Sequence, residues 1–140
     1  MSAPVSLFSW RIRVYWEDTD AGGVVYHASY LRFLERARTE WLRAQGLEQT
    51  RVRAEQGVVF VVYGMNLRFR RPAALDDEID ATLRVVARKA AALEFAQTLV
   101  RVADAVTLVE ATVRVACVSA TDFRPVPIPR NLLTEPTIQP

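Results

Sequence analysis

The segment from Tyr15 to Trp41 holds the residue types that could do chemistry. It reads YWEDTDAGGVVYHASYLRFLERARTEW and combines acidic side chains, a Gly-Gly pair and the only histidine of the chain, His27. Its expected order is strand, acidic turn, glycines and then helix. The first N–H groups of a helix have no intrahelical partner and carry the positive end of the macrodipole. A carboxylate just before such an end either caps the helix or acts on a substrate whose carbonyl oxygen binds those N–H groups.

Asp20 is the first candidate for a reactive carboxylate, and its alternative role is an Asx turn or a helix cap. Asp18, two residues earlier, fits a turn-forming role better. His27 falls at the expected helix start, where a cap-region or partly buried imidazole is the alternative. Glu35 lies within the helix, and a solvated pairing with Arg38 is its simplest explanation. From the residues alone, the segment suggests a site but no particular reaction.

Other catalytic motifs are absent from the chain. One histidine and one cysteine cannot assemble a typical zinc site, and no serine stands in a nucleophile elbow. The P-loop and GxGxxG patterns are missing as well. Cys117 lies in an apolar strand pattern and is interpreted as a buried small hydrophobe, with a reactive thiol as the alternative. An enzyme built on this chain would therefore use carboxylates, His27 and backbone dipoles, with no metal and no cofactor.

Length and composition predict a single domain over residues 1–140, with a core at about 8–120 and a Pro-rich tail at 121–140. Hydrophobic residues make up 51% and charged residues 24%, as in soluble globular proteins. The net charge of +2 and pI of about 9.0 come without a dense basic run, so no nucleic-acid partner is expected. The sequence shows no transmembrane run and no secretory signal, and a cytoplasmic location is expected.

The elements that must position the candidate residues follow from periodicity. After a loose lead-in over residues 1–9, alternation predicts a strand at 10–16, and turn residues fill 17–23. Apolar residues at helical spacing predict a long helix, which Gly46 ends. This long helix covers about residues 28–45. A weak helical turn is expected within 47–57, and strands are expected at 58–70 (with a bulge at Gly64), 79–86, 93–102 and 106–118.

Short links between the last four strands predict antiparallel neighbours. One long helix against a strongly twisted antiparallel sheet is an α+β arrangement, in which the helix covers the concave face. Strands that do not alternate with helices exclude a doubly wound nucleotide-binding fold.

The string DTDAGGVVYHASYLRFLERARTEWLR, from Asp18 to Arg43, closely resembles the hotdog-fold acyl-CoA thioesterases. Within them it is most similar to the YbgC-type enzymes associated with the Tol–Pal envelope system, and more distantly to the 4-hydroxybenzoyl-CoA thioesterase (4HBT) family. The string FVVYGMNLRFRRPAALDDEI, from Phe60 to Ile79, extends the likeness, which covers roughly residues 8–130. The resemblance implies a hotdog fold, in which a five-stranded antiparallel sheet wraps around the long helix.

The resemblance also implies an activity and a site. Members hydrolyse acyl-CoA, pair into homodimers with one continuous sheet, often form homotetramers, and place their active sites at the subunit interface. The residue matching Asp20 is the catalytic carboxylate, acting as nucleophile or as general base. His27 matches a histidine of the YbgC-type branch and would help to orient the reacting groups. N–H groups around Tyr26 and His27, with Gly23, would bind the thioester oxygen.

The substrate contacts are expectations of the same kind. Arg88 and Lys89 are the candidates for the CoA phosphates, with ordinary solvated turn charges as their alternative, and Arg70 and Arg71 are the second choice. The residues expected to shape the acyl pocket are Trp16, Phe33, Phe60, Val61 and Tyr63.

Two other functions compete with hydrolysis. A hotdog dehydratase or hydratase would place its histidine and acidic partner elsewhere in the fold, and the DTDAGG turn does not match that arrangement. A non-catalytic acyl-thioester-binding or interaction module of the cell-envelope machinery is the other alternative, and binding without turnover would identify it. Acyl carrier protein thioesters and a Tol–Pal association are further partners that the resemblance suggests.

Overall fold

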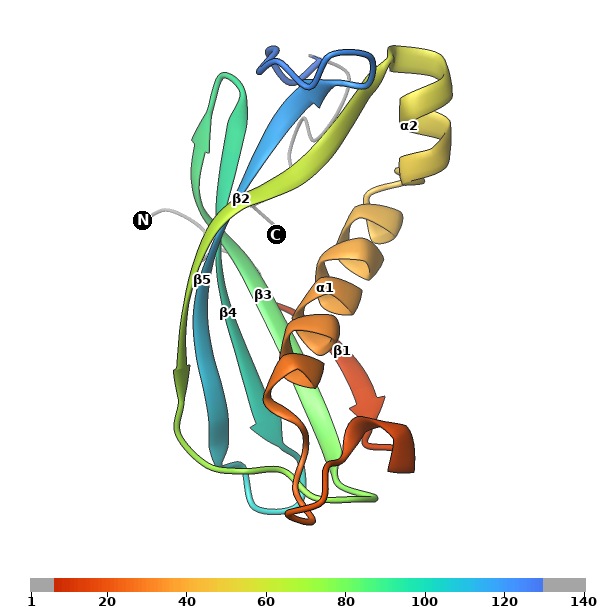
Figure 1. The fold of residues 1–140 in the computed structure, drawn as a ribbon. Helices are drawn as coiled ribbons and strands as arrows, with labels where there is room; N and C mark the ends of the chain where they lie inside the picture. The colour runs from red at the N-terminus through yellow and green to blue at the C-terminus, as the bar shows by residue number, and fades with distance from the viewer. Residues whose placement is uncertain (1–6, 130–140) are drawn as a thin grey trace, which may run out of the picture.

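The computed structural model describes residues 7–129, which form a curved five-stranded sheet with a long helix packed along one face (Figure 1). This arrangement confirms the α+β class. No helix in the described range is long and apolar enough to cross a membrane. In chain order the elements are β1 (Phe8–Arg13), the 3-10 turn η1 (Trp16–Asp18), α1 (His27–Ala44), α2 (Gln49–Gln56), β2 (Val58–Phe69), β3 (Glu78–Lys89), β4 (Ala92–Arg101) and β5 (Thr107–Ser119).

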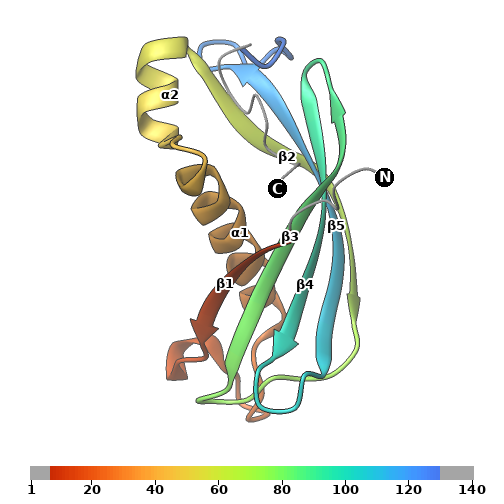
Figure 2. The same cartoon turned by 180° about the vertical axis from the view of Figure 1, so that it is seen from behind.

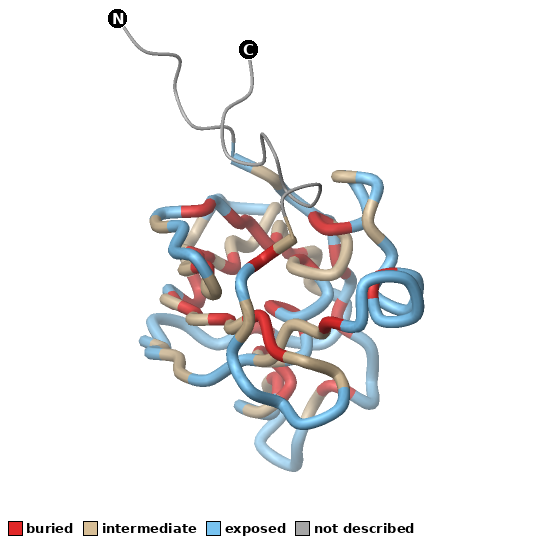
Figure 3. Tube along the Cα trace, turned by 90° about the horizontal axis from the view of Figure 1, so that it is seen from above, coloured by how far each residue is buried: buried red, intermediate tan, exposed pale blue. Residues whose placement is uncertain are grey.

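Helix α1 forms because its apolar residues recur on one face. Tyr30, Leu34, Ala37 and Trp41 are each at most 4% exposed and point into the core. Seen from above, the buried residues lie mainly toward the middle of the molecule, and the outer loops are exposed (Figure 3). Gly46 follows the helix with a φ of +83°, the left-handed conformation that commonly ends helices. The predicted helix at 28–45 is thus confirmed within one residue at each end.

The sheet has the strand order β1-β3-β4-β5-β2, and every neighbouring pair is antiparallel. The view from behind shows β1 beside β3 (Figure 2). The expectation that β2 and β3 are neighbours was wrong, because β2 pairs with β5 on the far side of the sheet. The link at residues 70–77 does not turn back as a hairpin, since it bonds to other elements along its way. Arg70 N–H donates to the carbonyl oxygen of Leu108 at 2.7 Å, and Asp76 N–H donates to that of Val14 at 3.1 Å.

Strand β2 is therefore an edge strand of the sheet. Its register against β5 shifts between Val62 and Gly64, which confirms the predicted bulge. A Cβ on Gly64 would lie 2.8 Å from Nη2 of Arg114, so this position leaves room for a guanidinium lying on the strand. Because one residue is skipped at the bulge, Phe60 and Phe69 both lie on the α1 side of the sheet.

The first strand differs from the expected one. It begins at Phe8, inside the segment expected to be a loose lead-in, and it is over before Val14. Ile12 and Val14 are buried as the alternation predicted, but Trp16 stands on the η1 turn and is 81% exposed. The strand stops pairing with β3 where the N–H of Val14 instead donates to the carbonyl oxygen of Asp77, at 2.9 Å.

Cys117 is fully buried on β5, as predicted, and burial raises the pKa of its thiol. The start of the Pro-rich tail packs against the sheet beside it. Val126 N–H donates to the carbonyl oxygen of Cys117 at 3.0 Å, and Ile128, itself buried, donates to that of Ala90 at 2.8 Å. Residues 130–140 of the tail lie outside the described range.

Candidate active site

A tight loop before α1 positions Asp20. A backbone bridge between Thr19 and Val25 closes this loop. Inside it, the Asp20 carbonyl oxygen accepts the N–H of Gly23 at 3.0 Å, and its side-chain Oδ1 accepts the N–H of Gly22 at 2.8 Å. The Asx turn considered from the sequence is therefore present. The carboxylate is nevertheless exposed, and its Oδ2 has no hydrogen-bond partner among the described residues, so one oxygen stays available for chemistry.

The two glycines of the loop have different roles. A Cβ on Gly22 would lie 3.1 Å from Oδ1 of Asp20, so a side chain there would push the carboxylate away. Gly23 has a φ of +83° with open space around it, so its role is conformational. The first glycine makes room for the carboxylate, and the second lets the backbone turn.

Asp18 is a structural residue, as its sequence context indicated. It is 2% exposed, and its Oδ2 accepts the N–H of Tyr15 at 2.8 Å. Its carbonyl oxygen accepts the N–H of Tyr26, also at 2.8 Å. Asp18 thus ties both sides of the loop together.

The N–H groups at the helix start differ in what they can bind. Those of Gly23 and Tyr26, both expected to face the substrate, donate to carbonyl oxygens of the loop. Those of His27 and Ala28 meet no acceptor anywhere in residues 7–129. The first turn of α1 therefore presents two adjacent free donors beside the loop that carries Asp20.

The link at residues 70–77 clamps this helix start. The hydroxyl oxygen of Tyr30 accepts the N–H of Ala73 at 3.0 Å in a buried contact, and the carbonyl oxygen of Ala73 accepts the N–H of Val25 at 2.8 Å. Burial raises the pKa of Tyr30; the Ala73 N–H opposes this rise, and the negative charge of Asp20 adds to it. The Tyr30 hydroxyl and the Ala73 carbonyl oxygen thus hold the link against the start of α1.

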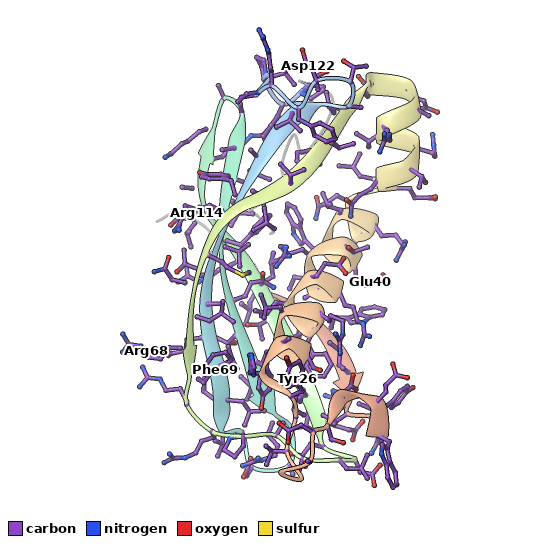
Figure 4. All side chains as sticks on the ribbon, viewed as in Figure 1. Tyr26, Glu40, Arg68, Phe69, Arg114 and Asp122 are labelled. Carbon is purple, nitrogen blue, oxygen red and sulfur yellow. The ribbon has the colours of Figure 1, made fainter. Side chains whose placement is uncertain are left out.

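An open pocket of about 280 Å³ adjoins the free donors. The His27 ring lies against Tyr26 with ring centroids 4.5 Å apart, and the Phe69 ring lies 5.7 Å from Tyr30. Figure 4 shows Phe69 pointing toward the start of α1 and Tyr26, while Arg68 points away from the helix. The pocket is lined by Val25, His27, Tyr30, Phe69, Arg70, Arg71 and Pro72.

The sequence did not single out Phe69 or Tyr30 as pocket residues. The strand alternation did place Phe69 on the same face as Met65 and Leu67, and that was the available signal. The alternation did not show that α1 begins opposite the Phe69 end of β2, because that position depends on the fold.

The expected CoA-binding residues lie in two places. Arg88 and Lys89 end β3, whose first residue is beside the helix start, so the length of the strand, roughly 35 Å, separates them from His27 (Figure 1). Within one chain they are not brought to the site. Arg70 and Arg71, the second choice, line the His27 pocket. Arg70 pairs with a carboxylate of β5, whereas Arg71 has no ion pair among the described residues.

Of the expected acyl-pocket residues, Trp16 is largely exposed and Phe33 is fully buried in the core, and neither is among the residues that line the His27 pocket. Tyr63 is 56% exposed on β2. Phe60 lines a separate pocket between α1 and the sheet. The sequence could not show which of these side chains are exposed, which are in the core and which line a pocket, because that depends on how the elements pack.

Comparison with known proteins identifies the family of this chain. A family model described as the thioesterase-like superfamily matches residues 14–135. The chain belongs to this superfamily. It is 44% identical over 130 residues to the acyl-CoA thioester hydrolase YbgC of Escherichia coli O157:H7, covering 93% of this chain and 96% of that protein. It is 45% identical over 125 residues to the acyl-CoA thioesterase YbgC of Haemophilus influenzae, covering 89% and 90%.

Solved structures give the same family. The crystal structure of a probable thioesterase from Bartonella henselae superposes with a TM-score of 0.84 at 34% identity, over 89% of this chain and 100% of that one. The resemblance to the hotdog thioesterases is thereby confirmed, and so is the hotdog fold. This member of the thioesterase-like superfamily is a thioester hydrolase.

Proposed function

We propose that this thioesterase hydrolyses acyl-CoA to the free acid and CoA at the loop of Asp20 and the start of α1. The observation that carries the proposal is the pair of free N–H groups at His27 and Ala28 beside a carboxylate with one open oxygen. The acyl-CoA hydrolase names of the two YbgC relatives support the choice of substrate.

The chemistry follows from these groups. The thioester oxygen would accept hydrogen bonds from the N–H groups of His27 and Ala28, which stabilise the charge that develops on it. Asp20 would attack the carbonyl carbon to give a mixed anhydride, which water then hydrolyses to the free acid and the Asp20 carboxylate, or Asp20 would take a proton from a water that attacks the thioester directly. The His27 side chain, which lines the pocket and packs on Tyr26, would orient the thioester or the water. CoA leaves as the thiolate in either route.

We also propose that two copies pair through their β2 edges into a homodimer. An edge strand exposes unpaired N–H and C=O groups, and long apolar edges invite pairing. β2 runs from Val58 to Phe69, and its apolar side chains Val62, Tyr63 and Phe69 are 44%, 56% and 53% exposed. Isologous pairing of two such strands is antiparallel and turns the second copy end for end. This brings the far end of the second copy's β3, with Lys89, to the end of the assembly that holds the first copy's site, three strands away from the paired edge.

The test is the release of free thiol from a panel of acyl-CoAs. Asp20→Asn keeps the shape and an oxygen for the Asx turn but removes the charge, and we expect turnover to fall by roughly a hundredfold or more. Asp122→Asn is the matched control, because Asp122 also accepts an N–H two residues on, that of Arg124 at 3.1 Å. Asp122 lies at the end of the sheet opposite Asp20 of its own chain (Figure 4), and its replacement should lower turnover far less than Asp20→Asn does.

Each other outcome has a definite meaning. Turnover that survives in Asp20→Asn would show that this carboxylate is not the reactive group. Tight binding of acyl-CoA without turnover in the unaltered protein would favour a binding module. Hydration of enoyl-CoA without thiol release would favour the hydratase alternative.

A further inference from the structure

A second pocket, of about 120 Å³, lies between α1 and the sheet on the same face as the His27 pocket. Its walls are mostly apolar, and one guanidinium, that of Arg38, stands among them. The pocket is lined by Glu35, Arg38, Thr39, Leu42, Gln49, Phe60, Val62, Leu93, Phe95 and Val115.

Arg38 is held in place but is incompletely bonded. Its Nη1 donates to Oε1 of Gln97 at 3.0 Å, and Gln97, which is 1% exposed, donates to the carbonyl oxygen of Leu34 at 3.1 Å. No carboxylate of residues 7–129 forms an ion pair with Arg38. Across the same range, no buried side-chain nitrogen or oxygen lacks a hydrogen-bond partner, so Nε and Nη2 of Arg38, which carry no hydrogen bond, are not fully buried in the wall of the pocket that Arg38 lines. A guanidinium that keeps unused N–H donors beside apolar side chains is suited to an oxygen acceptor.

The position of this pocket on β2 relates it to the active site. Phe60 and Val62 belong to the first half of β2, whereas Phe69, at the other end, lines the His27 pocket. Antiparallel pairing of two β2 edges sets the start of one strand against the end of the other. The His27 pocket of one copy then adjoins the Arg38 pocket of the second. This step rests on the homodimer and on the hydrolysis proposed above.

We propose that the Arg38 pocket receives the far end of the acyl group bound at the other copy's Asp20 and His27. It selects acyl groups that end in an oxygen acceptor over alkyl groups of the same length. An alkyl end would cover the free guanidinium N–H groups without bonding to them, whereas a terminal oxygen restores their hydrogen bonds.

Glu35 decides which terminal oxygen is favoured. Its carboxylate lines the same pocket, accepts the hydroxyl hydrogen of Thr39, and lies on the helix turn before Arg38. A terminal carboxylate would meet this like charge, so a terminal hydroxyl is the better ligand of the unaltered protein. Glu35→Gln removes the like charge and should raise the preference for the terminal carboxylate alone.

The test compares kcat/KM for alkyl, ω-hydroxy and ω-carboxy acyl-CoAs over four to ten carbons, each pair at equal length. We expect the ratio of kcat/KM for the ω-hydroxy acyl-CoA to kcat/KM for the alkyl acyl-CoA to exceed one at the acyl length that reaches Arg38. This ratio should fall roughly tenfold in Arg38→Met. Arg38→Lys keeps one charged donor and should fall less. Arg36→Met is the control, since Arg36 is exposed on the same helix and packs 5.7 Å over the Phe33 ring.

A ratio no greater than one at every length, or a ratio unchanged in Arg38→Met and Arg38→Lys, would overturn the proposal. Hydrolysis of the alkyl series by each variant shows that it is folded. If the unaltered protein hydrolyses no acyl-CoA, the proposed function fails instead, so the two failures are distinguishable.

Mixed dimers test whether the Arg38 pocket that binds the acyl end comes from the chain that supplies Asp20 or from its partner chain. In a dimer of one Asp20→Asn chain and one Arg38→Met chain, the site that keeps Asp20 faces the partner chain that keeps Arg38. The unaltered ratio at that site supports a pocket supplied by the second copy. The ratio of the Arg38→Met protein would place the pocket in the same chain and refute the shared arrangement.

Discussion

The contact between Tyr30 and Ala73 gives the sharpest test of how the site is held. The Tyr30 hydroxyl oxygen accepts the N–H of Ala73 at 3.0 Å, and both residues are buried. Ala73 in turn accepts the N–H of Val25, the residue that closes the Asp20 loop. Tyr30→Phe removes one oxygen and changes little else, because the ring keeps its place against Phe69.

The expected loss of stability follows from the group left behind. Ala73 is 0% exposed, so its N–H would lose its acceptor in a place that water does not reach. A buried donor without an acceptor costs about 1–3 kcal/mol. For a chain of this size, about 2 kcal/mol lowers Tm by roughly 6–10 °C.

The assay is thermal and urea unfolding at neutral pH, with amide hydrogen exchange at Ala73. Tyr26→Phe is the control, since the Tyr26 side chain is 44% exposed, and its unfolding midpoint should not move. An unchanged midpoint in Tyr30→Phe, with the Ala73 amide protected as before, would refute the clamp. Faster exchange at Ala73 together with the lower midpoint would support it.

Two further predictions concern pH and the loop. Burial raises the pKa of Tyr30 and of Cys117 above their ordinary values, so unfolded chains lose these protons first. Stability is then full below about pH 8, under the ordinary pKa of a thiol, and falls as pH rises, and Cys117→Ala should flatten part of this fall in urea midpoints measured from pH 7 to 11. Gly22→Ala should lower kcat roughly tenfold by displacing Asp20 with little change in stability, whereas Gly23→Ala should cost about 1–2 kcal/mol for its positive φ and largely keep kcat. Equal effects of both glycine changes on kcat and on the urea midpoint would refute the division of roles.

The sequence predicted the elements whose signals are local. The long helix follows from the spacing of Tyr30, Leu34 and Trp41 and from the glycine that ends it, and the bulge follows from Gly64. The neighbours of β2 were not predictable in this way. Its partner is β5, nearly 40 residues further along the chain at the closest, and no local pattern specifies that pairing.

The candidate site was readable only in part for the same reason. Asp20 and His27 are close in sequence and are joined by a glycine loop, so their approach to one helix end could be inferred. The sequence did not allow us to infer which N–H groups remain free of hydrogen bonds. The donor of Tyr26 is used by Asp18 because the bridge between Thr19 and Val25 closes the loop, and the sequence gives no sign of that bridge.

One feature of the topology accounts for both the pocket and the open edge. The link at residues 70–77 crosses the end of the sheet and bonds to β5, to the segment after β1 and to the helix start as it passes. A hairpin between β2 and β3 would have paired the β2 edge that is now open. Because the link crosses instead, β2 is left at the edge, and its last residues form the wall of the His27 pocket. The edge proposed for dimer pairing and one wall of the His27 pocket are therefore parts of the same strand, so a substitution in β2 that prevents pairing should also alter acyl selectivity.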